Sequence, residues 1–215
     1  MMPVYIHLEN VCFAYPGQTI FHDVSLTLAN DKKTILIARN GAGKSTLIAL
    51  IAHMLQPDQG GINVMVGDQI ISQTHFFQRL GLCLSHPYLL DDFNVHENLR
   101  IFASMYQHSE KQVDPTYLEQ LINLFGLQPL LYKKCKMLSQ GELKKVCLTR
   151  ALMHQPDFVF LDEPSNALDT RAKDLLSEHL KTLDALVVIA SHDRQWAAEI
   201  GHQVLTIENR GIHAL

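Results

Sequence analysis

The residues with the clearest chemistry lie in one segment, residues 38–46, which reads Ala-Arg-Asn-Gly-Ala-Gly-Lys-Ser-Thr between an apolar run and a helix-like pattern. Gly41 and Gly43 allow the backbone to turn tightly and to direct its N–H groups at a polyphosphate, and the start of the helix adds partial positive charge. Lys44 supplies a cation for the phosphates, and the Ser45 hydroxyl is a ligand for magnesium. The pattern therefore predicts a phosphate-binding loop.

Two later segments place carboxylates and a histidine after apolar runs. Residues 157–161 read as a buried parallel strand that ends in Asp162 and Glu163, and a second apolar run at residues 185–190 leads to His192. The carboxyl ends of parallel strands are where ligands bind in open α/β sheets, so we expect these side chains near the phosphates. Helix capping is the alternative interpretation of the two acids.

Three further residues suggest roles at the start of a helix and in a turn. Ser139 and Glu142 have the spacing of a capping box, which predicts the start of a long helix. Tyr15 lies in a turn at residues 15–18, between two segments of alternating polarity. An aromatic ring there could stack on a nucleotide base, and an ordinary turn tyrosine is the equal alternative.

The elements that must position these residues follow from their periodicity. Alternation predicts antiparallel strands at residues 4–13 and 20–28, a turn at 57–61 predicts a further hairpin with 62–66, and residues 80–84 read as a buried strand. Helical spacing appears over residues 95–108, 115–125 with Asp114 as its cap, and 170–183. We predict one α/β domain over residues 1–215, with a mostly parallel core sheet, an N-terminal antiparallel β part and a helical subdomain inserted over about 88–150.

Composition narrows the class of protein. The 18 basic and 22 acidic residues give a net charge of −4, which does not favour a nucleic-acid-binding protein. The four cysteines are far apart and predict neither a disulfide framework nor a zinc site. No uninterrupted apolar run approaches ~18 residues, and the start lacks the pattern of a signal peptide. We therefore expect a cytosolic protein that does not span a membrane.

The order and spacing of these segments resemble the nucleotide-binding domain of ATP-binding cassette (ABC) proteins over nearly the whole chain. Residues 38–46 are similar to the Walker A motif of P-loop nucleotide hydrolases, with alanine at the first position in place of glycine. Residues 158–163 resemble the Walker B motif, residues 166–169 the D-loop, and His192 the switch histidine. Residues 138–142, which resemble the LSGGQ signature, discriminate this family from other P-loop classes.

The resemblance implies a set of site residues for ATP. Nucleotide binding is assigned to Tyr15, as the adenine platform, and to Ala38, Arg39, Asn40, Gly41, Ala42, Gly43, Lys44, Ser45 and Thr46. Two such domains close head to tail, so that the ATP of one subunit also contacts the signature of its partner, which here comprises Leu138, Ser139, Gln140, Gly141 and Glu142.

The resemblance also implies how hydrolysis proceeds. Asp162 and Ser45 hold Mg²⁺, Glu163 polarises the attacking water, and His192 contacts the γ-phosphate. Asp169 of the D-loop links the two sites across the dimer. Phosphoryl transfer requires neutralised charge and an oriented nucleophile, and these residue types supply both.

The chain departs from the family pattern at two further places. The family has a glutamine after the strand near residue 84 that touches magnesium and reports to the membrane partner, and counting eleven residues back from Glu97 places His86 there. Histidine is bulkier than glutamine and can charge. The signature has Gln140 and Glu142 where its commonest form has glycine and glutamine, and we expect Lys144 and Lys145 to offset the charge of Glu142 near the phosphates.

The resemblance predicts the ATPase subunit of a membrane transporter, a homodimer that powers a separately encoded permease from the cytoplasmic face. We expect an exporter, because the chain has no room for the C-terminal regulatory domain of many importers and residues 89–99 are similar to exporter-type subunits, including the haem-exporter ATPases of cytochrome c maturation. The alternative is a soluble ABC-type ATPase, for example in iron–sulfur assembly. A nucleotide-binding scaffold without turnover is a third reading, and the intact Glu163 and His192 argue against it.

Overall fold

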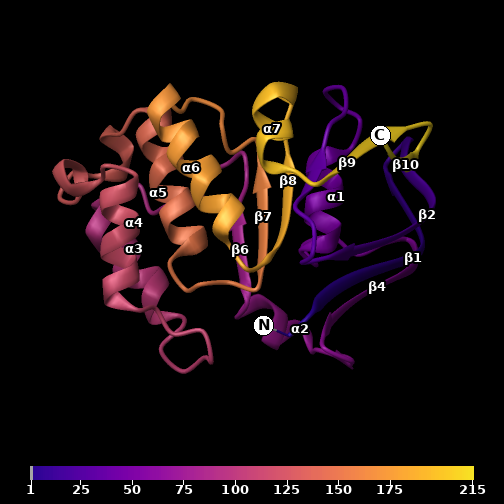
Figure 1. Cartoon of the computed structure of the whole chain (residues 1–215), viewed down its shortest axis with the longest axis horizontal. Helices are drawn as coiled ribbons and strands as arrows, with labels where there is room; N and C mark the ends of the chain where they lie inside the picture. The colour runs from indigo at the N-terminus through magenta and orange to yellow at the C-terminus, as the bar shows by residue number, and fades with distance from the viewer. Residues whose placement is uncertain (1) are drawn as a thin grey trace.

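The computed structural model of the chain describes residues 2–215, which form two β-sheets and the helices around them (Figure 1). The strands are β1 (Val4–Tyr15), β2 (Gln18–Ala29), β3 (Thr34–Leu36), β4 (Gln59–Val66), β5 (Gln69–Ile70), β6 (Leu80–Cys83), β7 (Phe158–Asp162), β8 (Leu186–Ala190), β9 (Gln203–Glu208) and β10 (Gly211–Ala214). The α-helices are α1 (Lys44–Ile51), α2 (Gln73–Phe77), α3 (Val95–Ser104), α4 (Pro115–Leu124), α5 (Gln140–Leu152), α6 (Thr170–Thr182) and α7 (Arg194–Ile200).

The larger sheet has the order β10-β9-β3-β8-β7-β6. Its strands run parallel except for β10, which pairs antiparallel with β9. The smaller sheet has the order β2-β1-β4-β5 and is antiparallel. The predicted α/β fold, with a mostly parallel core sheet and an antiparallel N-terminal part, is therefore confirmed.

Strand β7 shows why a continuous apolar run forms the centre of this fold. Alternate side chains belong to different hydrophobic clusters, with Phe158 and Phe160 on the side of α1, α2 and the smaller sheet, and Val159 and Leu161 on the side of helices α3 to α7. In Figure 1, α1 lies between the two sheets, while α5 and α6 lie on the opposite side of β7 and β8. Both faces are buried, which is typical of a central parallel strand.

The segment between β6 and β7 is mostly helical. The carboxylate of Asp114 caps α4 by accepting a hydrogen bond of 2.9 Å from the Thr116 N–H, and Pro115 occupies the first turn. At α5, the Ser139 hydroxyl accepts from the Glu142 N–H at 3.3 Å and the Glu142 carboxylate accepts from the Ser139 N–H at 2.7 Å. The capping box read from the sequence therefore begins α5.

The cysteines are free thiols in the part of the chain that the structure describes. Cys83, Cys135 and Cys147 are buried, and Cys12 is half-buried. Burial raises the pKa of Cys147 to about 12, so this thiol stays protonated at neutral pH. Across residues 2–215, no helix has both the length and the apolar character that a membrane span requires.

Buried His154 predicts a pH dependence of stability. Its ring stacks on Tyr106 with centroids 4.1 Å apart, and burial lowers its pKa from 6.5 to about 4. The unfolded chain therefore binds a proton that the folded chain rejects, so stability is full above about pH 6.5 and falls by roughly 3 kcal/mol as the pH drops to 4. Urea unfolding between pH 4 and 7 measures this loss. The His154→Phe variant keeps a ring without the proton, and an unchanged pH slope in it would contradict the assignment.

Candidate functional site

The phosphate-binding loop has the backbone that its glycines predict. Gly41 and Gly43 have φ angles of 78° and 111°, and Gly43 immediately precedes α1. A Cβ atom at Gly43 would lie 2.7 Å from the Ile20 side chain, so the loop requires glycine there for space as well as for φ. Ala38 does not adopt a positive φ, and alanine is therefore accommodated without strain at the position where the family pattern has glycine.

Lys44 is folded back over this loop. Its ammonium donates to the carbonyl oxygens of Ala38 at 2.9 Å and Arg39 at 3.5 Å, and only 7% of the residue is exposed. Phosphate oxygens are stronger acceptors for an ammonium than carbonyl oxygens, because the hydrogen bond then joins two charges. The lysine is therefore placed to exchange these carbonyls for a bound polyphosphate.

Two hydroxyl groups and one carboxylate meet at the carboxyl end of β7. Asp162 is 2% exposed, and its Oδ2 accepts hydrogen bonds from the Oγ atoms of Ser45 and Ser85, each at 2.8 Å. Hydroxyl and carboxylate oxygens are the ligands that Mg²⁺ prefers, so this donor set fits the predicted cation. Ser45 and Asp162 were expected together from the sequence, whereas Ser85 was missed.

Glu163 and His192 also meet, at the ends of the neighbouring strands β7 and β8. The Oε2 of Glu163 lies 2.7 Å from the Nδ1 of His192 and accepts from the His192 N–H at 3.3 Å. Glu163 has a φ of 48° and donates its own N–H to the Ala190 carbonyl at 2.9 Å. The predicted base and the predicted switch histidine are therefore in contact, and the histidine engages one of the two carboxylate oxygens.

A cavity of about 440 Å³ joins most of these groups. It is lined by residues from the end of β1, the start of β2, the phosphate loop, the start of α1 and the end of β7: Tyr15, Gln18, Ile20, Asn40, Gly41, Gly43, Lys44, Ser45, Thr46, Asp162 and Glu163. The structure thus brings the predicted aromatic, cationic and acidic residues to one open site.

Tyr15 stands at the rim of this cavity and is 43% exposed. Its ring and that of Phe13 pack in a T-shaped pair with centroids 5.0 Å apart, which holds the tyrosine ring in place while much of it stays exposed for stacking. We predict that Tyr15→Ala weakens ATP binding by ~1–3 kcal/mol, whereas Tyr15→Phe changes it little, because stacking needs the ring and not the hydroxyl. Titration of both variants with ATP checks this, and equal affinities for alanine and wild type would make the ring a simple turn residue.

The signature-like residues 138–142 lie at the start of α5 and not at the phosphate loop. Among the described residues that line the 440 Å³ cavity, none belongs to the segment 138–142. Ser139 and Gln140 are exposed at the N-terminus of α5, where backbone N–H groups and the helix dipole favour an anion. Gly141 packs against the loop before α6, since a Cβ there would lie 2.4 Å from the Ala167 carbonyl oxygen.

The charge of Glu142 is compensated differently from the prediction. Lys133 lies 3.5 Å from both carboxylate oxygens, and the hydrogen bond from the Ser139 N–H is the main cause that lowers the pKa of Glu142. Lys144 instead donates to the carbonyls of Leu84 and Asp162, each at 3.4 Å, and Lys145 pairs with Asp169 at 2.9 Å. The expectation for Lys144 and Lys145 was wrong because both point away from the cap.

Asp169 and His86 have contacts of their own. Asp169 caps α6 by accepting from the Ala172 N–H at 2.8 Å, in addition to its ion pair with Lys145. The Nδ1 of His86 accepts from the Tyr88 N–H at 3.1 Å, and the two rings meet with centroids 4.5 Å apart. The sequence count therefore selected a residue that faces Tyr88, and the side chain that reaches Asp162 is its neighbour Ser85.

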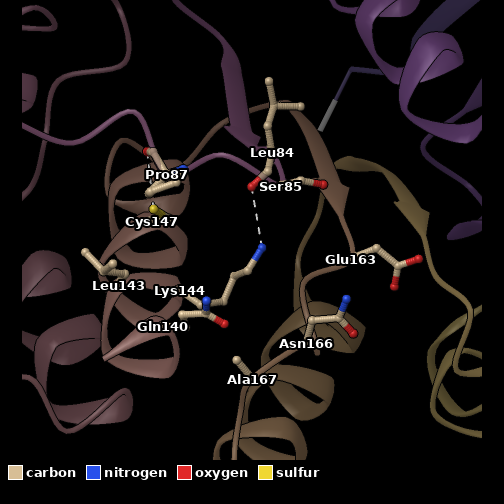
Figure 2. A pocket seen from close by; sticks show the side chains of 10 residues that line it. All are labelled: Leu84, Ser85, Pro87, Gln140, Leu143, Lys144, Cys147, Glu163, Asn166 and Ala167. Atoms are coloured by element: carbon tan, nitrogen blue, oxygen red, sulfur yellow. Dashed lines mark hydrogen bonds between the residues drawn. The ribbon is translucent and has the colours of Figure 1, made fainter. Parts of the chain in front are cut away.

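A second cavity, of about 350 Å³, adjoins the site on the side of α5. Figure 2 shows its lining, with Lys144 extending from α5 between the segment at Leu84 and Ser85 and the loop at Asn166 and Ala167. Glu163 lines both cavities. The predicted base is thus shared between the phosphate loop and the face of α5.

A phosphate loop on a parallel sheet, with Asp162 and Glu163 at the end of a neighbouring strand, defines a P-loop nucleotide hydrolase. The family described as "ABC transporter" matches residues 21–166. The chain belongs to the ABC transporter family, as an ATP-binding subunit with ATPase activity.

Individual relatives agree on the class but differ in direction. The chain is 29% identical to the Nod factor export ATP-binding protein I of Rhizobium johnstonii, over 97% of this chain and 68% of that protein. It is 28% identical to the zinc import ATP-binding protein ZnuC of Buchnera aphidicola, over 97% of this chain and 82% of that one. A solved dimeric bacterial ABC transporter cassette matches with a TM-score of 0.84 at 21% identity, over 97% of this chain and 96% of the other. That structural match supports the fold.

Proposed function

We propose that this chain hydrolyses ATP with Mg²⁺ as a homodimer closed around the nucleotide, and that it powers a membrane permease. The observation that carries the proposal is the convergence of Ser45 with Asp162, and of His192 with Glu163, beside Lys44 and its loop. Phosphoryl transfer depends on positioned charges and an oriented water more than on covalent chemistry by the protein. These residues supply both requirements.

Each side chain has a distinct part in this proposal. The amides of residues 39–46 and the ammonium of Lys44 bind the phosphates, and Asp162 and Ser45 hold Mg²⁺, which neutralises charge on them. His192 leaves Glu163 for the γ-phosphate, and this exchange frees the Glu163 carboxylate to accept a proton from water. The 2.7 Å contact between the two side chains supports this exchange, because it shows that the histidine and the glutamate are within reach of one another.

The dimer completes each site from the partner's signature. Residues 138–142 stand at the N-terminus of a 13-residue helix, outside the cavity of their own phosphate loop. We assign them to the ATP of the other subunit, where Ser139 and the helix N-terminus meet the γ-phosphate. Asp169, at the cap of α6, lies on the loop that would face the partner.

The proposed partner is an integral membrane permease, with the ATPase on the cytoplasmic face of the membrane. We propose that residues 1–215 act as one ATPase domain with residues 88–150 as its inserted helical subdomain. Export is the proposed direction, supported by the Nod factor export relative and by the likeness of residues 89–99 to exporter-type subunits. The zinc import relative supports the opposite direction, and an ATPase unconnected to transport is the alternative function.

Reconstitution tests the whole proposal. The chain is co-expressed with each candidate permease of its own genome, placed in vesicles with the ATPase outward, and assayed for ATP hydrolysis and for substrate movement. We expect Mg²⁺-dependent hydrolysis that the permease stimulates, with substrate accumulating inside the vesicles, which is the direction of export. Loss of substrate from preloaded vesicles would indicate import. Hydrolysis without membrane association or stimulation would favour the alternative function.

A further inference from the structure

Asp162 has one hydroxyl partner more than the sequence predicts. Ser45 approaches Oδ2 from the start of α1, and Ser85 approaches the same oxygen from the connection that follows β6, each at 2.8 Å. Asp162 is 2% exposed, so its charge depends on such donors more than on water. Ser85 itself is exposed and thus lies between the carboxylate and the solvent.

The backbone that carries Ser85 is fixed from the other side by α5. Three α5 residues at intervals of three donate to main-chain carbonyls of residues 84–88. Lys144 donates to Leu84 at 3.4 Å, Cys147 to Pro87 at 3.3 Å, and Arg150 to Pro87 at 2.9 Å and to Tyr88 at 2.8 Å. Figure 2 shows Lys144 and Cys147 facing this segment. Because the backbone of residues 84–88 is held in place, a side chain as short as that of Ser85 reaches the Asp162 carboxylate.

We propose that Ser85 is a positioning residue of the cation site, acting through Asp162. This inference rests on the proposed function, in which Mg²⁺ accompanies ATP. Ser45 is required as a ligand of the cation, and Ser85 is the donor that then remains to hold the Asp162 carboxylate in place. His86, whose contacts are with Tyr88, has no part in this role.

The test measures cation affinity rather than turnover. Free Mn²⁺ is followed by electron paramagnetic resonance while Mn²⁺ is titrated into protein saturated with a non-hydrolysable ATP analogue. Loss of a group that orients a metal ligand costs about 10–100-fold in metal affinity. Ser85→Ala is therefore expected to raise the midpoint, the Mn²⁺ concentration at half-saturation, by at least ~10-fold. Ser85→Thr keeps the hydroxyl and is expected to stay within about threefold of wild type. His86→Ala is the matched control and is expected to leave the midpoint unchanged.

Two outcomes would overturn the inference. One is a Mn²⁺ midpoint that Ser85→Ala does not raise more than His86→Ala does. The other is an equal loss of analogue affinity in Ser85→Ala with and without EDTA, because the residue would then shape the loop and not the cation site. Thermal unfolding of each variant verifies that the fold is retained. A wild-type protein that binds the analogue independently of Mn²⁺ would instead contradict the Mg²⁺ part of the proposed function.

Discussion

Glu163→Gln is expected to lower ATP turnover by ~10²–10⁴, the share of the rate that a positioned general base contributes. Glutamine keeps the size of the side chain and loses the carboxylate that accepts a proton. ATP binding is expected to persist, because Lys44 and the loop amides are untouched, and the ATP-bound dimer is expected to accumulate. A phosphate-release assay and light scattering with ATP measure the two effects.

The control for this variant is Glu199→Gln, which makes the same change on the exposed surface of α7. Hydrolysis by Glu199→Gln is expected to match wild type. Near-wild-type hydrolysis by Glu163→Gln would remove Glu163 from the reaction. A Glu163→Gln variant that neither hydrolyses nor binds ATP would indicate that the backbone at residue 163, which has a φ of 48°, no longer holds its conformation. The kinetics would then not support Glu163 as the general base.

His192→Ala is expected to lower kcat by ~10²–10³, the cost of removing one donor aimed at charge that develops in the transition state. The KM for ATP is expected to change little, since the side chain is 58% exposed and does not line the phosphate-loop cavity. Steady-state kinetics separate the two constants. His213→Ala, at an exposed position of β10, is the matched control.

The contact between His192 and Glu163 makes this experiment sharper. If the histidine only restrains the glutamate, then His192→Ala would free the base and raise turnover. If it contacts the γ-phosphate as proposed, turnover falls although the base is free. The sign of the change therefore separates a restraining role from a catalytic one, and an increase would contradict the assignment.

Local sequence signals predicted those parts of the site whose chemistry is encoded by neighbours in the chain. The glycines of the phosphate loop, the capping box of Ser139 and Glu142, and the apolar strand ending in Asp162 each depend on a few adjacent residues. Their positions agree with the structure. The proximity of Glu163 to His192 could also be expected, because each residue follows an apolar strand and the two strands, β7 and β8, are neighbours in a parallel sheet.

Contacts between distant segments were not predictable in this way. Ser85 has no motif of its own, and only the placement of β6 beside β7 brings it to Asp162. The pairing of Glu142 with Lys133 depends on how the short turns before α5 fold back on its cap. The pairing of β9 with β3 was missed because the two strands lie far apart in the sequence. Register across a sheet is a tertiary property.

The close approach of Gly141 to Ala167 has a mechanical consequence. A Cβ atom built on Gly141 would lie 2.4 Å from the Ala167 carbonyl oxygen, so the start of α5 and the loop before α6 are in direct contact and cannot move closer. If the partner's ATP pushes the signature end of α5 toward this loop, the loop has to move with it, and Ala167 lies four residues beyond Glu163. A nucleotide bound at the partner's site would then act on the segment that follows Glu163 in this subunit. Two reporter groups, one at the start of α5 and one on the loop before α6, would keep a constant separation through the cycle.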